Sequence, residues 1–299
     1  MRIISHQPLP EREYRKKGVF MAKVIGFWNR KGGVGKTHGA YNVGASLALS
    51  GKKILLIDGD SQINLTYRVF GNEEEVYADG GAEYKEDNLV TLVDVISNPE
   101  SIHEAVLTAY FEAKRKTQDG GETHMISCEM DLLPGSKMLD FVNPPSVDCL
   151  KKAINLLSDN YDLIILDFPP SSSQYTDCFL AACDYVISPV VINEDESLSG
   201  YMAVQEMVSG AVNGGLNPNL KLLGMYYTKV QEYKPMHKDS LMDSRSMKDE
   251  WKILDSYIRM DERYKDSSHY KFLPLCIDVP RRPITIDYQN LASEILAKI

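Results

Sequence analysis

The chain has 299 residues, of which 43% are apolar, 25% charged and 9% aromatic. These values are ordinary for a globular protein and exclude a disordered chain, a collagen-like fibre and a coiled-coil rod. Acidic residues outnumber basic residues by 42 to 33, which gives a formal net charge of −9. That balance argues against a chain that is basic overall, as many DNA-coating proteins are, but it leaves room for a local basic face.

Cysteine usage and hydropathy favour a protein of the reducing cytoplasm. The five cysteines are odd in number and form no C-x-x-C pair, so neither a disulfide framework nor a zinc site is indicated. No apolar run approaches the roughly 18 residues needed to span a bilayer, and the polar residues 1–20 do not resemble a signal peptide. We therefore expect a cytoplasmic protein without membrane contact, with an amino-terminal extension over residues 1–20 and a single domain over residues 21–299.

Short apolar runs alternate with longer helical patterns along the chain. In chain order we expect a strand at 23–28, a helix at 36–50, strands at 53–58 and 130–133, a helix at 147–158, a strand at 161–167, a helix at 173–182, a strand at 185–191, a helix at 197–212, a strand at 220–227, a helix at 243–259, a strand at 270–275 and a final helix at 286–298. Residues 71–88 and 114–123 are polar and contain glycine, so we expect surface loops there. The alternation predicts an α/β fold with a mostly parallel central sheet and helices on both faces.

The strongest motif runs from Asn29 to Thr37 and reads N-R-K-G-G-V-G-K-T. It follows the first expected strand and precedes the first expected helix, which is the context of a phosphate-binding loop. The glycines let backbone N–H groups turn toward phosphate oxygens, and the helix start adds partial positive charge. Lys36 would reach the β- and γ-phosphates, and the Thr37 hydroxyl would bind Mg²⁺. The plain pattern has glycine where this chain has Arg30, and a second lysine, Lys31, begins the glycine run.

The segment from Lys31 to Thr37 resembles the deviant Walker A box of the ParA/MinD ATPase superfamily. The resemblance implies a P-loop NTPase fold, hydrolysis of ATP, and Mg²⁺ as the cation. It also implies that Lys31 reaches across a homodimer interface to the partner's nucleotide. A cation that neutralises the γ-phosphate only when two subunits meet would make the dimer a sensor of triphosphate. The residues that we assign to nucleotide contact in this segment are Lys31, Gly32, Gly33, Val34, Gly35, Lys36, Thr37 and His38.

Two aspartates follow the strand expected at 53–58. Asp58 and Asp60 lie in D-G-D-S-Q-I-N-L-T, which resembles the family stretch D-x-D-P-Q-x-N-x-T with Ser61 and Ile63 as departures. The carboxyl ends of parallel strands face the ligand crevice, so a role at the nucleotide is favoured over a pair of turn-forming aspartates. The resemblance implies that Asp60 orients or activates the attacking water and that Asp58 supports the Mg²⁺ and water shell.

Other candidate residues follow later strands. The strand at 161–167 ends in Asp167, the position of a Walker B carboxylate that would hold the Mg²⁺ shell. The next residues, F-P-P-S-S, resemble the family's D-x-P-P-S switch segment, which would place Pro169 near the γ-phosphate. In this family the adenine is held by residues after two late strands, and the matching positions are Thr228 and Pro274. Ordinary strand ends with a turn proline explain these two residues equally well.

Further matches indicate the plasmid and chromosome partition branch of the superfamily. T-L-V-D-V-I at 91–96, L-L-P-G-S at 132–136 and Y-Q-N-L-A-S-E-I at 288–295 resemble partition proteins. By this resemblance the ATP-bound dimer would bind DNA nonspecifically at the nucleoid, and a ParB-like centromere-binding partner would stimulate hydrolysis. Two alternatives stay open: a positioning ATPase of the same superfamily that carries a protein cargo without DNA, and a metabolic ligase or amidotransferase built on a related loop.

A DNA-binding surface on this acidic chain needs a local excess of basic residues. Residues 229–282 hold 12 lysines and arginines against 10 acidic residues, while the rest of the chain holds 21 against 32. This segment is the most suitable for phosphate contact, although a mixed-charge helix is usually only solvated. The residues that we assign to DNA contact are Arg245, Lys248, Lys252, Arg259, Arg263, Arg281 and Arg282.

Overall fold

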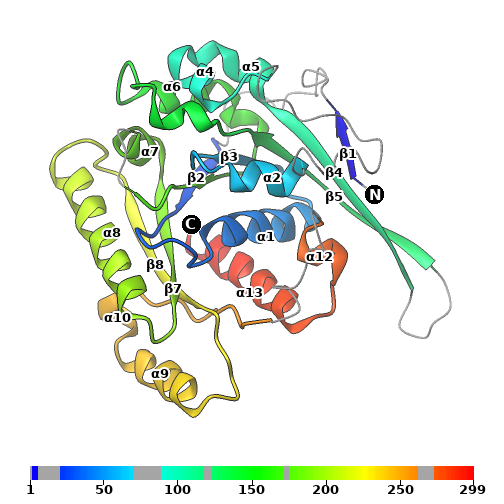
Figure 1. The fold of residues 1–299 in the computed structure, drawn as a ribbon, viewed down its shortest axis with the longest axis vertical. Coiled ribbons are helices and arrows are strands. Elements are labelled where there is room, and N and C mark those ends of the chain that lie inside the picture. The colour runs from blue at the N-terminus through cyan, green and yellow to red at the C-terminus, as the bar shows by residue number, and fades with distance from the viewer. Residues whose placement is uncertain (1, 6–20, 71–88, 117–122, 172–174, 262–272) are drawn as a thin grey trace.

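The computed structural model describes residues 2–5, 21–70, 89–116, 123–171, 175–261 and 273–299. These residues form an eight-stranded sheet with helices on both faces (Figure 1). The strand order is β1-β4-β5-β3-β6-β2-β7-β8. The strands are β1 Arg2–Ser5, β2 Lys23–Phe27, β3 Ile54–Asp58, β4 Leu107–Lys116, β5 Thr123–Leu133, β6 Leu163–Asp167, β7 Tyr185–Val191 and β8 Lys221–Thr228.

Most of the sheet is parallel, which confirms the predicted fold class. The six neighbouring strands β5-β3-β6-β2-β7-β8 all pair in parallel, whereas β4 pairs antiparallel with both β1 and β5. Every residue of β3 and β6 is buried. These strands read as unbroken apolar runs because helices cover both of their faces.

Two apolar cores lie on the two faces of the sheet. Successive residues of β2 point to opposite faces of the sheet, so Ile25 belongs to one core and Val24 to the other. Helices α1, α2, α12 and α13 contribute to the first core and helices α4 to α8 to the second (Figure 1). The helices are α1 Lys36–Leu49, α2 Asn64–Phe70, α4 Leu92–Ser97, α5 Ile102–Ala105, α6 Cys149–Leu157, α7 Thr176–Ala182, α8 Asp195–Asn213, α9 Pro235–Ser246, α10 Lys248–Trp251, α12 Leu275–Asp278 and α13 Pro283–Lys298.

The antiparallel part of the sheet differs from the sequence prediction. We expect a short strand at 130–133 and a loop at 114–123, but β5 begins at Thr123 and β4 continues to Lys116. The amino-terminal half of β5 is largely exposed, so it lacks the apolar run that marks the central strands. The loop expected at 71–88 lies outside the described residues.

The prediction of a single helix at 243–259 is wrong. The chain forms α9 and α10 there, and Lys252 ends α10 with a left-handed φ of 50°. Beyond it, Ile253 and Arg259 make isolated parallel bridges with Met225 and Val230. The strand expected at 270–275 is also wrong where it is described, because its last residue begins α12.

The amino-terminal residues 2–5 form β1, which pairs antiparallel with β4. Residues 6–20 lie outside the described ranges, so the division between an extension at 1–20 and a domain at 21–299 stays a prediction. In the part of the chain that the structure describes, no helix has the length and hydropathy to cross a bilayer.

Aromatic rings pack together just beyond the ends of β2 and β6. The fully buried rings of Trp28 and Phe168 stack with centroids 5.1 Å apart. Phe179 of α7 meets Phe168 edge-on at 5.3 Å. A Cβ at Gly26 would lie 2.4 Å from the Phe168 ring, so the glycine makes room for this stack. The contacts fix the carboxyl ends of β2 and β6 relative to one another.

Candidate functional site

The loop between β2 and α1 has the backbone of an anion-binding turn. Gly33 and Gly35 adopt φ of 71° and 106°, a region that strains residues with a Cβ. Gly32 and Gly33 are exposed, and an added Cβ would meet nothing within 4 Å at either position. The first turn of α1 contains no acidic residue. Open glycine backbone and a positive helix end therefore leave a place for phosphate.

Lys36 and Thr228 hold this loop from the inside. Lys36 is only 6% exposed, and its Nζ donates a hydrogen bond to the carbonyl of Lys31 at 3.2 Å. Thr228, at the end of β8, donates from Oγ1 to the carbonyl of Val34 at 2.9 Å. Burial lowers the pKa of Lys36, while the charge of Asp167 and a further carboxylate act in the opposite direction. The ammonium group thus lies close to the carboxylates of the site.

Asn29 is a residue of the site that the sequence reasoning missed. It is fully buried, and its Nδ2 lies 3.2 Å from Ser188 Oγ, 2.9 Å from the carbonyl of Pro189 and 3.0 Å from the carbonyl of Ser197. Its Oδ1 accepts a hydrogen bond from the backbone N–H of Lys31 at 2.9 Å. Asn29 therefore ties the start of the phosphate loop to β7 and to the start of α8.

Asp167 ends β6 and is fully buried. Within the described part of the chain, neither of its carboxylate oxygens accepts a hydrogen bond of ordinary geometry. Its neighbours in the sheet register are Phe27 and Asp58. Burial raises the pKa of Asp167 well above its usual range and Asp58 adds to the rise, while Thr37 and Lys36 act in the opposite direction. A buried carboxylate without partners is costly, so the position favours the binding of a cation.

Asp58 is also fully buried, at the end of the adjacent strand β3. Its Oδ2 accepts hydrogen bonds from the Thr66 N–H at 2.8 Å and from the Thr66 hydroxyl at 2.7 Å. Burial raises the pKa of Asp58 to about 6, although these hydrogen bonds oppose the rise. Asp60 is 7% exposed, and burial raises its pKa, while the N–H of Gln62 and the charge of Lys36 lower it. The structure therefore gathers three of the predicted carboxylates beside one buried lysine.

The donor set fits Mg²⁺. This ion prefers oxygen ligands, keeps several waters and is usually held by one or two carboxylates together with phosphate oxygens. Asp167 offers two oxygens that accept no ordinary hydrogen bond from the described residues, and the Thr37 hydroxyl interacts with the same carboxylate. Within the described ranges no three His, Cys, Asp or Glu side chains are arranged to hold a metal. The arrangement therefore suits a cation whose remaining ligands are phosphate and water.

The other residues assigned to the nucleotide lie around the same strand ends. His38, in the first turn of α1, is half-buried, and burial lowers its pKa to about 3, so the imidazole is neutral near pH 7. Pro169 is buried two residues beyond β6. Pro274 is buried and precedes α12, where the Leu275 N–H donates to Asn42 Oδ1 of α1 at 3.0 Å. The adenine assignments stay predictions.

Several of the basic residues that we assign to DNA contact form ion pairs within the chain. Arg259 makes a two-point pair with the buried carboxylate of Asp287, with N–O distances of 2.7 and 2.9 Å, and lies 3.3 Å from Glu232. Two others are paired as well: Lys248 with Asp255, and Arg282 with Asp261 at 3.4 Å. Arg281 is exposed, whereas the side chain of Arg245 and the whole of Arg263 lie outside the description.

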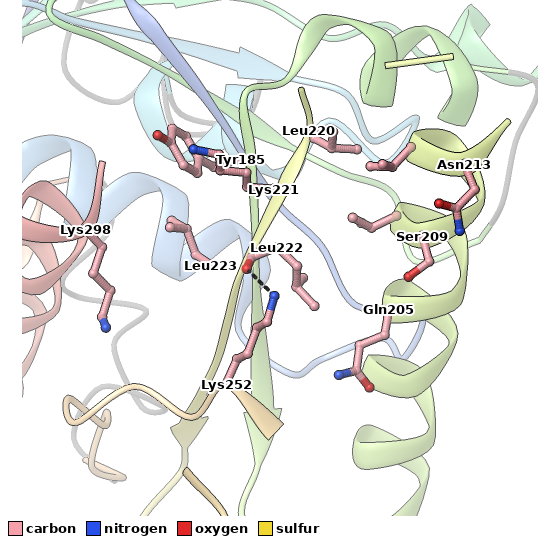
Figure 2. A pocket seen from close by; sticks show the side chains of 12 residues that line it. Tyr185, Gln205, Ser209, Asn213, Leu220, Lys221, Leu222, Leu223, Lys252 and Lys298 are labelled. Carbon is pink, nitrogen blue, oxygen red and sulfur yellow. Dashed lines mark hydrogen bonds between the residues drawn. The ribbon is translucent and has the colours of Figure 1, made fainter. Parts of the chain in front are cut away.

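Lys252 lies at a separate cavity of about 640 Å³, shown in Figure 2. Lys221 and Lys298 line the same cavity, and Lys221 lies over the ring of Tyr185 at 5.9 Å. Lys252 Nζ donates to the carbonyl of Leu222 at 3.5 Å. The cavity is at the amino ends of β7 and β8, whereas the phosphate loop follows the carboxyl end of β2. It is therefore distinct from the nucleotide site.

Gly200 of α8 tests the importance of the Asn29 contacts. A Cβ there would lie 2.2 Å from Asn29 Oδ1 and 3.1 Å from the Lys31 nitrogen. We expect Gly200→Ala to displace the loop and to lower the free energy of unfolding by about 1–3 kcal/mol, with weaker nucleotide binding. Gly210→Ala on the same helix meets nothing within 4 Å and is the matched control, expected to be neutral or stabilising by up to ~1 kcal/mol. Denaturation measures the free energy of unfolding, and titration with a fluorescent nucleotide measures the affinity. If Gly200→Ala and Gly210→Ala had the same stability and affinity, the role of Asn29 would be contradicted.

The raised pKa of Asp58 gives a pH dependence of stability. A folded-state pKa of about 6 against an ordinary value of 3.8 means that the folded state holds the proton more tightly, so this group's contribution to stability falls as pH rises from about 4 to about 6. Asp58→Asn can keep both Thr66 hydrogen bonds through its Oδ1 while losing the charge. We expect the variant to remove up to about 3 kcal/mol of that decline in metal-free protein, as measured by denaturation at pH 4 to 7. Parallel pH profiles of variant and wild type would refute the assignment.

Known proteins match this chain over the region that builds the site. Residues 22–222 match the AAA_31 family, described as an AAA domain. The chromosome-partitioning ATPase Soj of Treponema pallidum strain Nichols is 31% identical over 209 residues, which are 70% of this chain and 72% of that protein. Among solved structures, the ATP complex of a Cyanothece McdA variant has a TM-score of 0.70 at 18% identity and covers 93% of this chain and 97% of its own.

A second solved structure shares the fold. Cobyrinic acid a,c-diamide synthase from Mycobacterium smegmatis, with bound ADP and magnesium, has a TM-score of 0.63 at 24% identity and covers 92% of this chain and 94% of its own. At these identities the two structures bear on the fold alone, which they confirm as that of a P-loop NTPase. The family match includes the phosphate loop and both strand-end carboxylates, Asp58 and Asp167. The chain therefore belongs to the AAA_31 family and is a ParA-like ATPase of the ParA/MinD superfamily.

Proposed function

We propose that this ATPase is a dimerising switch that uses ATP and Mg²⁺ to partition plasmid, mobile-element or chromosomal DNA. The observation that carries the proposal is the different placement of the two loop lysines. Lys36 is buried and interacts with Asp167 and Asp60. Lys31 keeps 37% of its side chain exposed. A buried lysine serves the phosphates of its own site, and a solvent-exposed lysine on the same loop is accessible to a second subunit.

Each residue of the site has a role in binding and hydrolysing ATP. Residues 32–37 cradle the phosphates, and Lys36 balances their charge. Asp167 and Thr37 would hold the magnesium ion together with water, and the ion would neutralise charge on the β- and γ-phosphates. Asp60 orients the attacking water, and its raised pKa makes it a better proton acceptor once it is ionised. Asp58, fixed by Thr66, supports the water shell.

The partner's Lys31 couples dimerisation to the triphosphate. In the closed dimer each Lys31 contacts the nucleotide of the other subunit and adds positive charge where the γ-phosphate carries negative charge. Hydrolysis removes that charge, and the dimer loses its advantage over the monomers. The switch therefore alternates between a paired state with ATP and separate subunits with ADP.

The proposed cargo is DNA, with a ParB-like protein as the partner that stimulates hydrolysis. Relatives of this chain are named as chromosome-partitioning proteins, which supports DNA as the cargo. Nonspecific contact with duplex phosphates at the nucleoid needs basic side chains that are not already paired. Among those that we assign, Lys252 is exposed and lies near Lys221 and Lys298, whereas Arg259 is held by two carboxylates.

Replacing Lys31 tests the switch. We expect Lys31→Ala to bind ATP but to remain monomeric with a slowly hydrolysed ATP analogue and Mg²⁺, because the dimer loses the cation that it shares. Arg30→Ala is the matched control, since Arg30 is exposed and directly precedes Lys31, and it should still dimerise. Sedimentation velocity and light scattering measure the oligomeric state. A Lys31→Ala protein that dimerises normally would refute the switch.

DNA binding is tested with random-sequence duplex. We expect a gel shift with ATP and Mg²⁺ that weakens steeply with salt, and Lys252→Ala should weaken binding and lower the salt slope by about 1. Lys152→Ala, which removes an exposed lysine on α6, is the control and should leave binding unchanged. No shift at ~50 mM salt would favour a protein cargo instead of DNA.

A further inference from the structure

The exposed ammonium group of Lys31 has a partner within its own chain. Its Nζ forms an ion pair with Glu196, in the first turn of α8. The hydrogen bond and charge of Glu196 raise the pKa of Lys31, and Lys31 in turn lowers the pKa of Glu196. Glu194 adds a smaller attraction of the same sign. The lysine that is to act across a dimer interface is therefore held by the protomer that carries it.

The backbones that carry the two charges are fixed relative to one another. Asn29 joins the Lys31 N–H to the carbonyl of Ser197, the residue after Glu196. Ser197 is fully buried, and its hydroxyl accepts a hydrogen bond from the Val191 N–H at 2.8 Å. These hydrogen bonds fix the backbone near Lys31 and near Glu196, while the two charged side chains remain partly exposed to solvent.

We propose that Glu196 is a positioning residue that holds Lys31 within its own subunit and opposes the use of Lys31 across the dimer interface. The inference rests on the proposed function, since it concerns the same lysine. Glu196 and the partner's phosphates compete for the same ammonium group, so dimer formation has to weaken or break two such pairs. With 37% of the Lys31 side chain and 72% of the Glu196 side chain exposed, the pair is weak enough for a triphosphate to replace it. Glu196 thereby raises the concentration of ATP-loaded subunits at which dimers form.

Dimerisation of Glu196→Gln tests this proposal. With a slowly hydrolysed ATP analogue and Mg²⁺, we expect the dissociation constant of the Glu196→Gln dimer to fall by about 2- to 30-fold, because two exposed ion pairs no longer have to be broken. The difference should shrink at 0.5 M salt, since salt screens the pair in wild type. Glu206→Gln removes an exposed charge from the same helix and should dimerise as wild type does.

The outcomes separate this inference from the proposed function. If wild type dimerises and Glu196→Gln dimerises equally or more weakly, Glu196 does not restrain Lys31, while the switch itself stands. If wild type does not dimerise with the analogue, the switch fails and the inference fails with it. General damage to the fold would weaken dimerisation, so tighter dimerisation is a result that a merely structural role does not produce.

A second measurement examines the ion pair in the monomer. Without nucleotide, we expect an amine-acetylating reagent to modify Lys31 about 2- to 10-fold faster in Glu196→Gln than in wild type, because the free amine is more abundant and less shielded. Mass spectrometry after digestion locates the acetyl group, with Lys152 as the internal reference. Unchanged labelling of Lys31 would show that Glu196 does not hold it and would overturn the proposal.

Discussion

The constraint around which the site is built is the burial of Asp167, whose carboxylate accepts no hydrogen bond of ordinary geometry from the residues that the structure describes. Its register neighbour Asp58 is buried as well, so the folded chain places two carboxylates side by side at the centre of the sheet. Desolvation and mutual repulsion both work against ionisation there. The buried Lys36 offsets part of this cost, and a magnesium ion with phosphate oxygens would offset more. Binding of the nucleotide with its cation would therefore stabilise the folded chain.

The start of α8 connects this site to the edge of the phosphate loop. Asn29 ties the loop to Ser197, Gly200 leaves the space that Asn29 needs, and Glu196 holds the side chain of Lys31. The start of α8 therefore sets the position of the phosphate loop, its packing and the direction of the Lys31 side chain. A shift of α8 would alter all of them together.

The sequence predicted the phosphate loop and the strand-end carboxylates because each lies in a short motif after an apolar strand. Asn29 stood inside the motif, yet its role depends on residues about 160 positions away, which no local pattern contains. The hairpin of β4 and β5 escaped prediction because its outer half is exposed. The helix expected at 243–259 failed because the left-handed Lys252 ends α10, after which Ile253 and Arg259 make parallel bridges to the edge of the sheet.

The stacked rings at the strand ends give the chain an optical reporter of its own. Trp28 directly precedes Asn29, and Phe168 directly follows Asp167, so the stack joins the start of the phosphate loop to the end of β6. The chain contains two tryptophans, and the second, Trp251, ends α10. Because Trp28 is fully buried against Phe168, a displacement of either strand end would change the surroundings of its indole ring. The ultraviolet fluorescence of the unlabelled protein therefore includes a signal from the residue that precedes the phosphate loop.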